Sequence, residues 1–205
     1  MQRGSKVSEL EGKCAGLLRD VGDVEAPSSR KSCDWLRSPA HEDQGGRVAR
    51  WQDIVESAPD LAAQVRTVFE SHKHKLIATL RRDGSPRLSG LEVEFRAGEV
   101  TFGMMPRSQK CADLRRDPRT EIHSMSVVPV GDEESWPGDA RISGRAREIT
   151  DPGERRRFTD SPPEAYPLFV LDIERVVRIK VDGSPPHLLI QTWHPGHPLE
   201  STFAD

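Results

Sequence analysis

The chain has 205 residues, enough for one domain of ordinary size and an additional segment. Charged residues make up 31% and hydrophobic residues 35% of it, and the formal net charge at pH 7 is −3. This small negative charge excludes the strongly basic field of a general nucleic-acid-binding protein. The sequence also has no apolar run of about 18 residues, so no transmembrane helix is predicted. We therefore expect neither nucleic acid nor a membrane as a partner.

The first 47 residues differ in composition from the rest of the chain. They carry many charged and small residues and few apolar ones, with breaks at Ala26–Ser29 and Gly45-Gly46. This composition predicts a polar, disordered N-terminal extension (residues 1–47) ahead of a folded domain (residues 48–205). Residues 1–20 also lack the apolar core of a secretory signal, and no C-x-x-C pair occurs, so we expect a cytoplasmic protein.

Helical periodicity begins at Trp51. Apolar residues recur at helical spacing from Trp51 to Ala58 and again from Leu61 to Phe69, with Pro59 in the first turn of the second stretch. The pattern predicts one or two helices that end near His72.

Short apolar or alternating runs then predict six or seven antiparallel strands joined by short turns. Leu88 and Leu91 are three residues apart, so in a regular strand they would face opposite sides of the sheet. A β-bulge at Gly90, which lies between them, would place both on the same side and is therefore predicted. Residues after Trp193 are expected to be loop. Short turns between strands favour a closed or partly open β-barrel over a parallel sheet. The expected strands are Leu76–Leu80, a run through Leu88–Phe95, Val100–Met104, Ile122–Val128, Ala140–Arg147, Leu168–Val181 and Leu188–Trp193.

A phosphate site is predicted where a helix follows the strand that ends at Met104. Ser108 stands at the start of that helix, and Lys110 lies two residues later. The N–H groups at a helix N-terminus and a lysine ammonium group together favour a phosphate. Arg107 adds a second positive charge. An S-x-K sequence alone is a weak motif, and its alternative interpretation is a helix cap beside a solvated lysine.

Two stretches carry a family resemblance. Leu76–Arg87, with its Asp83-Gly84 turn, resembles the first hairpin of the pyridoxamine 5′-phosphate oxidase-like, FMN-binding split β-barrel family. Ser108–Arg119 resembles the S-x-K helix of the same family, including the following Pro-Arg pair. The resemblance covers roughly residues 50 to 200 and implies a mainly β (α+β) fold, a split β-barrel of about six antiparallel strands with peripheral helices.

The resemblance also implies a cofactor and the residues that hold it. The family binds FMN across a homodimer interface and transfers hydride to or from a small molecule, so we expect a flavin-dependent oxidoreductase that acts as a homodimer. The flavin supplies the hydride chemistry itself. The implied flavin-binding residues are Ile77, Ala78 and Thr79 on the first strand, Gly103 and Met104 at the strand end, Ser108 and Lys110 at the phosphate, and Trp193, which can approach the ring from the partner subunit. Arg107, predicted above from its charge alone, completes the set of expected cofactor-binding residues.

Several positions depart from the family pattern. Pyridoxamine phosphate oxidases carry an Arg and a Lys on the second strand, where this chain has Ser89, Glu92 and Glu94. They place Tyr and Thr at the positions of Gly103 and Met104, and the family's C-terminal Arg-x-His is absent. These differences argue against oxidation of vitamin B6 compounds. Two alternatives stay open: a reductase that uses the deazaflavin coenzyme F420, and a flavin-binding protein without catalysis.

Histidines near the C-terminus offer a weaker hypothesis. His187, His194 and His197 lie close together in the sequence, but a His-Pro-Gly-His-Pro loop is poorly suited to hold a metal ion rigidly. We expect no metal site.

Overall fold

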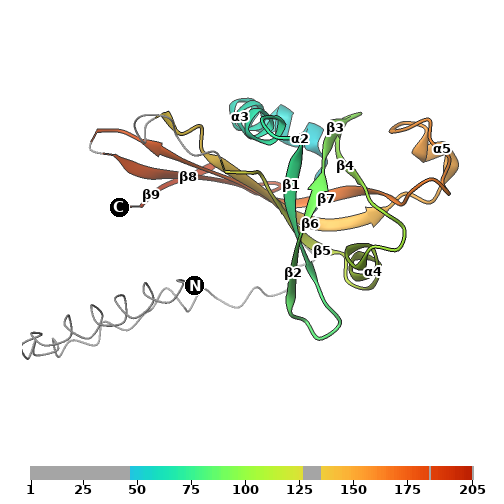
Figure 1. Cartoon of the computed structure of the whole chain (residues 1–205). Helices are drawn as coiled ribbons and strands as arrows, with labels where there is room; N and C mark the ends of the chain where they lie inside the picture. The colour runs from blue at the N-terminus through green and yellow to red at the C-terminus, as the bar shows by residue number, and fades with distance from the viewer. Residues whose placement is uncertain (1–46, 127–134, 185, 205) are drawn as a thin grey trace, which may run out of the picture. The chain divides into compact units, whose positions relative to one another are not determined.

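The computed structural model describes residues 47–126, 135–184 and 186–204, and a single antiparallel sheet organises them (Figure 1). The predicted extension, residues 1–47, lies outside the described residues apart from Arg47. The strands are β1 (His74–Leu80), β2 (Pro86–Glu92), β3 (Glu94–Arg96), β4 (Glu99–Gly103), β5 (Arg119–His123), β6 (Asp139–Glu148), β7 (Leu168–Asp182), β8 (His187–Trp193) and β9 (Glu200–Ala204). The helices are α2 (Trp51–Ser57), α3 (Pro59–Glu70), α4 (Gln109–Arg116) and α5 (Pro152–Arg155).

Strand β7 is the strand on which the sheet divides, because it pairs with β6 along one edge and with both β4 and β8 along the other. The order of the strands is β2-β1-β5-β6-β7-β4-β3. Strand β6 pairs with β7 along almost its whole length, whereas the other edge of β7 is divided: Leu168–Val170 pairs with β4, and Val176–Asp182 pairs with β8. The sheet stays open between β2 and β3, the two ends of this order. The prediction of a mainly β, split-barrel fold with peripheral helices is confirmed.

A β-bulge in β7 lies opposite Gly144. Ser143 pairs with Arg175 and Gly144 pairs with Ile173, so Glu174 is an extra residue on β7. A β-carbon on Gly144 would lie 2.1 Å from the carbonyl oxygen of Asp172. Only glycine fits here, because the bulge brings the two backbones together.

The predicted bulge at Gly90 is wrong. The β1–β2 register runs without a shift from His74 opposite Glu92 to Leu80 opposite Pro86. Leu88 instead lies on the outer face of the edge strand β2, with 65% of its surface exposed. Leu88 and Leu91 therefore lie on opposite faces of β2, and Leu88 is an apolar residue exposed on the outer face.

Two other sequence predictions miss the observed strands. The strand expected at Ile122–Val128 is β5, which begins earlier, at Arg119. Its buried residues are Thr120 and Ile122, so the inward-facing side of the strand starts before the apolar run of the sequence. Residues 127 and 128 lie outside the described residues. The tail, expected to be loop, contains β9, which pairs with the free edge of β8. The ring of Phe203 on β9 contacts His187 at 4.7 Å between centroids.

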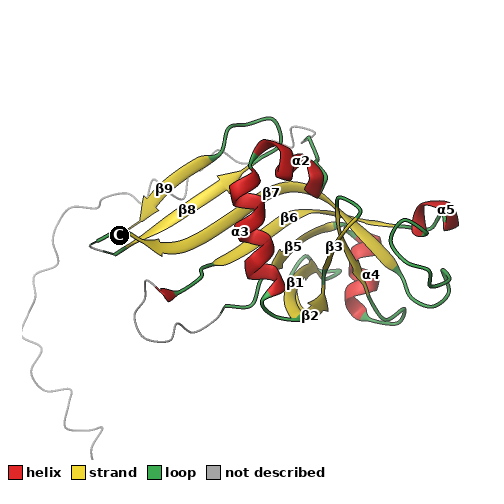
Figure 2. Cartoon of the chain, turned by 90° about the horizontal axis from the view of Figure 1, so that it is seen from above, coloured by secondary structure: helices red, strands yellow, loops and turns green. Residues whose placement is uncertain are grey.

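The helices cover the core as the periodicity predicts. Helix α3 begins at Pro59, buries Leu61, Val65 and Phe69, and crosses the sheet over β6 (Figure 2). Fully burying a side chain of this size contributes about 1.5–3 kcal/mol. Within the described part of the chain, no helix has the length and apolar character needed to cross a membrane.

We expect Gly144→Ala to destabilise the fold and Gly90→Ala to leave it nearly unchanged. The Gly144 methyl group would displace backbone at the bulge, at a cost of about 2–3 kcal/mol or more. A β-carbon on Gly90 meets no atom within 4 Å, so this matched substitution should change the free energy of unfolding by less than about 1 kcal/mol. Urea denaturation of both variants checks this, and equal losses would contradict the bulge geometry.

Candidate functional site

Helix α4 starts where the sequence predicts, directly after the end of β4. The chain leaves β4 at Gly103 and reaches Ser108, whose backbone is extended (φ −71°, ψ 143°). The Ser108 hydroxyl accepts a hydrogen bond from the Cys111 N–H at 3.4 Å, which is a long N-cap contact. The other N–H groups of the first turn, those of Gln109 and Lys110, have no acceptor within the helix and point toward its N-terminal end.

A buried carboxylate holds α4 against the sheet. The Asp113 side chain is 4% exposed and accepts hydrogen bonds from three groups: Arg87 Nε on β2 at 2.7 Å, Thr79 Oγ1 on β1 at 3.1 Å, and Arg116 of α4 at 3.0 Å. Burial raises the pKa of Asp113, but the hydrogen bonds from Arg87, Arg116 and Thr79 lower it by more, so its pKa lies below the ordinary value. Asp113 is therefore a charged anchor between α4, β1 and β2.

A cleft of about 550 Å³ opens beside the first turn of α4. Ser108 and Lys110 line it on the helix side, and Gly103 to Pro106 line the neighbouring wall. Residues of β2, β3 and the segment before β7 complete the lining: Gly90, Leu91, Glu92, Glu94, Ala165 and Tyr166, with His74 at the start of β1. The cleft is thus formed by elements that are far apart in the sequence.

Lys110 is the cation that faces this cleft from α4. Its ammonium group donates a hydrogen bond to the carbonyl oxygen of Gly90 on β2. Burial lowers the pKa of Lys110. The ammonium group is therefore held at the cleft between the helix and the edge strand.

Two carboxylates also line the cleft, and one of them lies on β2, the strand whose Gly90 carbonyl Lys110 contacts. Glu92 lies 3.3 Å from Lys73 and 3.5 Å from His74, whereas Glu94 comes from β3. Together with Lys110, these carboxylates give the cleft both signs of charge. An anionic group is favoured beside Lys110 and disfavoured beside Glu94, whereas Lys73 balances part of the charge of Glu92.

The structure brings four of the predicted site residues together at the cleft: Gly103, Met104, Ser108 and Lys110. The remaining ones do not line it. Ile77 is buried in the core, the Ala78 carbonyl accepts from Thr120, and the Thr79 hydroxyl is bound to Asp113. Arg107 is exposed outside the lining.

Trp193 also lies apart from the cleft. Its side chain is buried in the core of its own chain, and the indole N–H donates to the Ser57 hydroxyl at 3.1 Å. This contact joins β8 to the end of α2. A role against a partner's flavin stays a prediction that this placement does not support.

Sequence reasoning missed Asp113, Arg87 and Tyr166. For Asp113 one local signal existed, because it is an acidic residue between Cys111 and Leu114, the two apolar positions that α4 buries. Its basic partner Arg87 lies on another element, which the sequence pattern does not reveal. Tyr166 precedes β7 in a segment without periodicity.

No cluster of three or more metal-ligating side chains occurs among residues 47–126, 135–184 and 186–204. The rings of His194 and His197 lie 6.4 Å apart between centroids.

A family profile described as pyridoxamine 5′-phosphate oxidase matches residues 61–180, more than half of the chain. The chain belongs to the pyridoxamine 5′-phosphate oxidase family. The matched range includes β1 to β6, α4 and most of β7, and so every residue that lines the cleft. No curated protein matches the chain.

Solved structures of low sequence identity resemble this family member. One is a pyridoxamine 5′-phosphate oxidase-related, FMN-binding protein from Nostoc punctiforme, with 14% identity, a TM-score of 0.48, and coverage of 74% of this chain and 96% of that one. A heme-binding protein from Mycobacterium smegmatis has 19% identity, a TM-score of 0.46, and coverage of 71% and 58%. General Stress Protein 26 from Bacillus anthracis has 14% identity, a TM-score of 0.43, and coverage of 62% and 95%.

We expect Asp113→Asn to reduce the free energy of unfolding by about 2–3 kcal/mol, because it removes the charge from three hydrogen bonds and leaves Arg87 without its carboxylate. The matched control is Asp117→Asn at the C-terminal end of α4, where the pair with Arg119 is more exposed and should contribute less than about 1 kcal/mol. Equal effects at the two positions would contradict the anchoring role of Asp113.

The effect of Asp113→Asn should also depend on pH. The folded-state pKa is depressed, so the carboxylate stabilises the fold fully above the unfolded pKa of about 3.9. This contribution is lost as the pH falls through the lower folded-state pKa. Denaturation at a series of pH values should therefore show the variant and the original protein converging in acid.

Proposed function

We propose that this protein binds FMN in the cleft beside α4 and acts as a flavin-dependent oxidoreductase on a small molecule. The observation that carries the proposal is the joint placement of Ser108 and Lys110 at the first turn of α4, facing one cleft, in a chain of the pyridoxamine 5′-phosphate oxidase family.

The helix end fits a phosphate group. Unpaired N–H groups and the helix dipole favour an anion at this position, and the Lys110 ammonium group adds a full charge. The Ser108 hydroxyl accepts only a long hydrogen bond from Cys111, so its own proton is available for a phosphate oxygen. Lys110 would exchange its contact with the Gly90 carbonyl for a charged partner, which is the stronger hydrogen bond.

The remaining cleft fits a planar, largely apolar ring system. Its volume lies within the roughly 300–1,000 Å³ of small-molecule and cofactor sites. Met104, Met105 and Pro106 supply an apolar wall next to the phosphate position. A flavin, when bound, supplies hydride chemistry, and the residues of the chain bind and orient it and shape the space for a substrate.

We further propose that the active form is a homodimer. Leu88 on β2 and Met105 in the segment before α4 are 65% and 79% exposed. Met105 lines the cleft, and Leu88 lies on the strand that carries its residues Gly90 to Glu92. Burial of such apolar side chains against a second copy removes them from water, and a two-fold arrangement is the commonest way to do so.

Lys110→Ala is expected to weaken FMN binding by about 1.5–3 kcal/mol, the contribution of a hydrogen bond to a charged group. The measurement is a fluorescence titration of apoprotein with FMN, with thermal unfolding to show that the variant is folded. Arg107→Ala is the matched control, because it removes a nearby cation that does not line the cleft, and it should change the affinity much less. An unchanged FMN affinity in Lys110→Ala would overturn the proposed phosphate site.

FMN affinity should also fall as the pH rises. The Lys110 ammonium group is charged below its pKa, and burial lowers that pKa, so the attraction to phosphate is lost earlier than for an ordinary lysine with a pKa of about 10.4. Lys110→Arg keeps its charge throughout this range. FMN titrations from neutral to alkaline pH should show a steeper loss for the original protein than for Lys110→Arg, and parallel curves would count against Lys110.

The identity of the cofactor is tested by the visible absorption spectrum of the purified protein and the mass of the molecule released on denaturation. A two-band flavin spectrum with the mass of FMN supports the proposal. A deazaflavin spectrum would replace FMN by coenzyme F420 in the same cleft. A protein that binds neither compound after both are added back would refute the proposed activity.

A further inference from the structure

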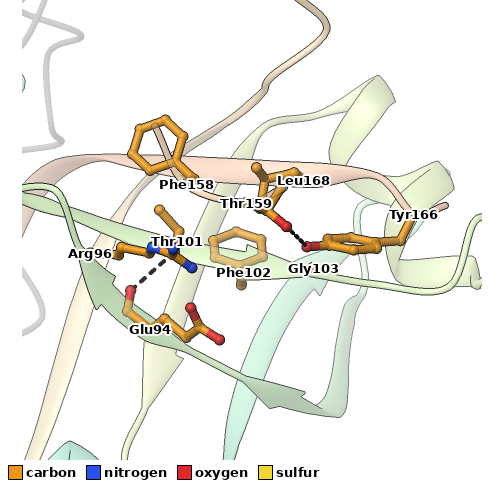
Figure 3. Close-up of a pocket in the computed structure, with 9 residues that line it drawn as sticks. All are labelled: Glu94, Arg96, Thr101, Phe102, Gly103, Phe158, Thr159, Tyr166 and Leu168. Carbon is orange, nitrogen blue, oxygen red and sulfur yellow. Dashed lines mark hydrogen bonds between the residues drawn. The ribbon is translucent and has the colours of Figure 1, made fainter. Parts of the chain in front are cut away.

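A second, smaller cavity of about 110 Å³ shares part of its lining with the cleft, and Figure 3 shows the residues that line it. Glu94, Gly103 and Tyr166 line both spaces. In Figure 3, Tyr166 and Thr159 lie at one end of the small cavity, and Glu94 and Arg96 lie at the other. The Tyr166 side chain therefore belongs to a boundary between two neighbouring spaces.

The Tyr166 ring is held in place by its own segment. Its hydroxyl donates to Thr159 Oγ1 at 3.0 Å. The guanidinium carbon of Arg155 lies 4.8 Å from the ring centroid, and the same group donates to the Tyr166 carbonyl at 2.9 Å and to the Ser161 carbonyl at 3.1 Å. Because Arg155 is only 2% exposed, this cation–π contact is shielded from water and is stronger than a surface one.

On the other side, the ring packs directly on the backbone of β4. A β-carbon at Gly103 would lie 2.8 Å from two ring carbons of Tyr166. The adjacent backbone is joined as well, since Met104 N–H donates to the Pro167 carbonyl at 3.2 Å. The absence of a side chain at Gly103 is thus what allows the ring to lie against β4, where it lines both the cleft and the small cavity.

We propose that Tyr166 determines the size of the molecule that the cleft admits, by separating the cleft from a second polar subsite. Removal of the ring would join the two cavities into one longer site. This inference rests on the proposed function in one respect, that the cleft is where a ligand binds; it does not depend on that ligand being FMN.

The space behind Tyr166 is suited to a small polar group. Thr101, Thr159 and Arg96 offer hydroxyl and guanidinium groups, and Phe102, Phe158 and Leu168 supply apolar sides. A cavity needs only about 10–15 Å³ to hold one water molecule, so this one has room for a hydroxyl group. Glu94, which also lines it, disfavours a carboxylate there. An aromatic molecule with a polar end is therefore the chemical class that the joined site would accept.

The test uses two probes that differ only in length, 4-hydroxybenzoate and 4′-hydroxybiphenyl-4-carboxylate, on the full-length protein. In Tyr166→Ala we expect the longer probe to bind at least about tenfold tighter than in the original protein, because its second ring contacts the apolar sides of the small cavity and its hydroxyl group reaches the polar ones, and even one added apolar group in a pocket is worth roughly this factor. The shorter probe should change much less. Amide NMR shifts of Thr101 and Phe158, which line only the small cavity, should respond to the longer probe in the variant alone.

Tyr166→Phe is the matched control, since it keeps the ring and loses only the hydroxyl bond to Thr159, and it should discriminate by length like the original protein. If Tyr166→Ala does not fold, Tyr166→Leu replaces it. The proposal is overturned if the ratio of the two affinities is the same with and without the ring, or if a folded variant binds neither probe. A separate FMN titration of the original protein tests the proposed function, so the two failures are distinguishable.

Discussion

The hydrogen bonds of Asp113 are the interaction on which the site depends. They join α4 to β1 and β2 through Thr79 and Arg87, and they do so with a carboxylate that is almost fully buried. A buried charge is tolerated only when its hydrogen bonds are satisfied, so these partners define one position for the helix. The N-terminus of α4, with Ser108 and Lys110, is thereby fixed at the mouth of the cleft.

The second constraint is the divided edge of β7. Its first residues pair with β4, which leads directly into the α4 segment, and its later residues pair with β8. The bulge at Glu174 lies between the two halves, where Gly144 allows the backbones to approach. The segment before β7 carries Tyr166 to the end of β4, so the same pairing that splits the sheet also places the wall of the cleft.

Local chemistry explains which parts were predictable from the sequence. The Ser108 cap, the length of α4 and the alternating strands follow from propensities and patterns within a few residues, and the structure contains them. Long-range features did not follow: the Asp113–Arg87 pair joins residues 26 positions apart, and β9 forms only because β8 offers a free edge.

The candidate site was predictable in part for the same reason. Its helix end was identified because Ser108 and Lys110 are neighbours in the sequence. The prediction that β1 residues bind the cofactor was less accurate. Alternation shows that Ile77 and Thr79 lie on the same face of the strand, but it does not show that this face is covered by the core and by Asp113. Parity alone also misled at Gly90, because it does not show whether the outer face of β2 is covered.

The central claim is that the first turn of α4 holds the phosphate group of a flavin. It is tested most directly by titrating the apoprotein with FMN and with riboflavin, which carries the same ring and lacks the phosphate. The account predicts that FMN binds more tightly by about 1.5–3 kcal/mol, and that Lys110→Ala removes most of this difference. Equal affinities for the two compounds, or a difference that Lys110→Ala leaves intact, would contradict it.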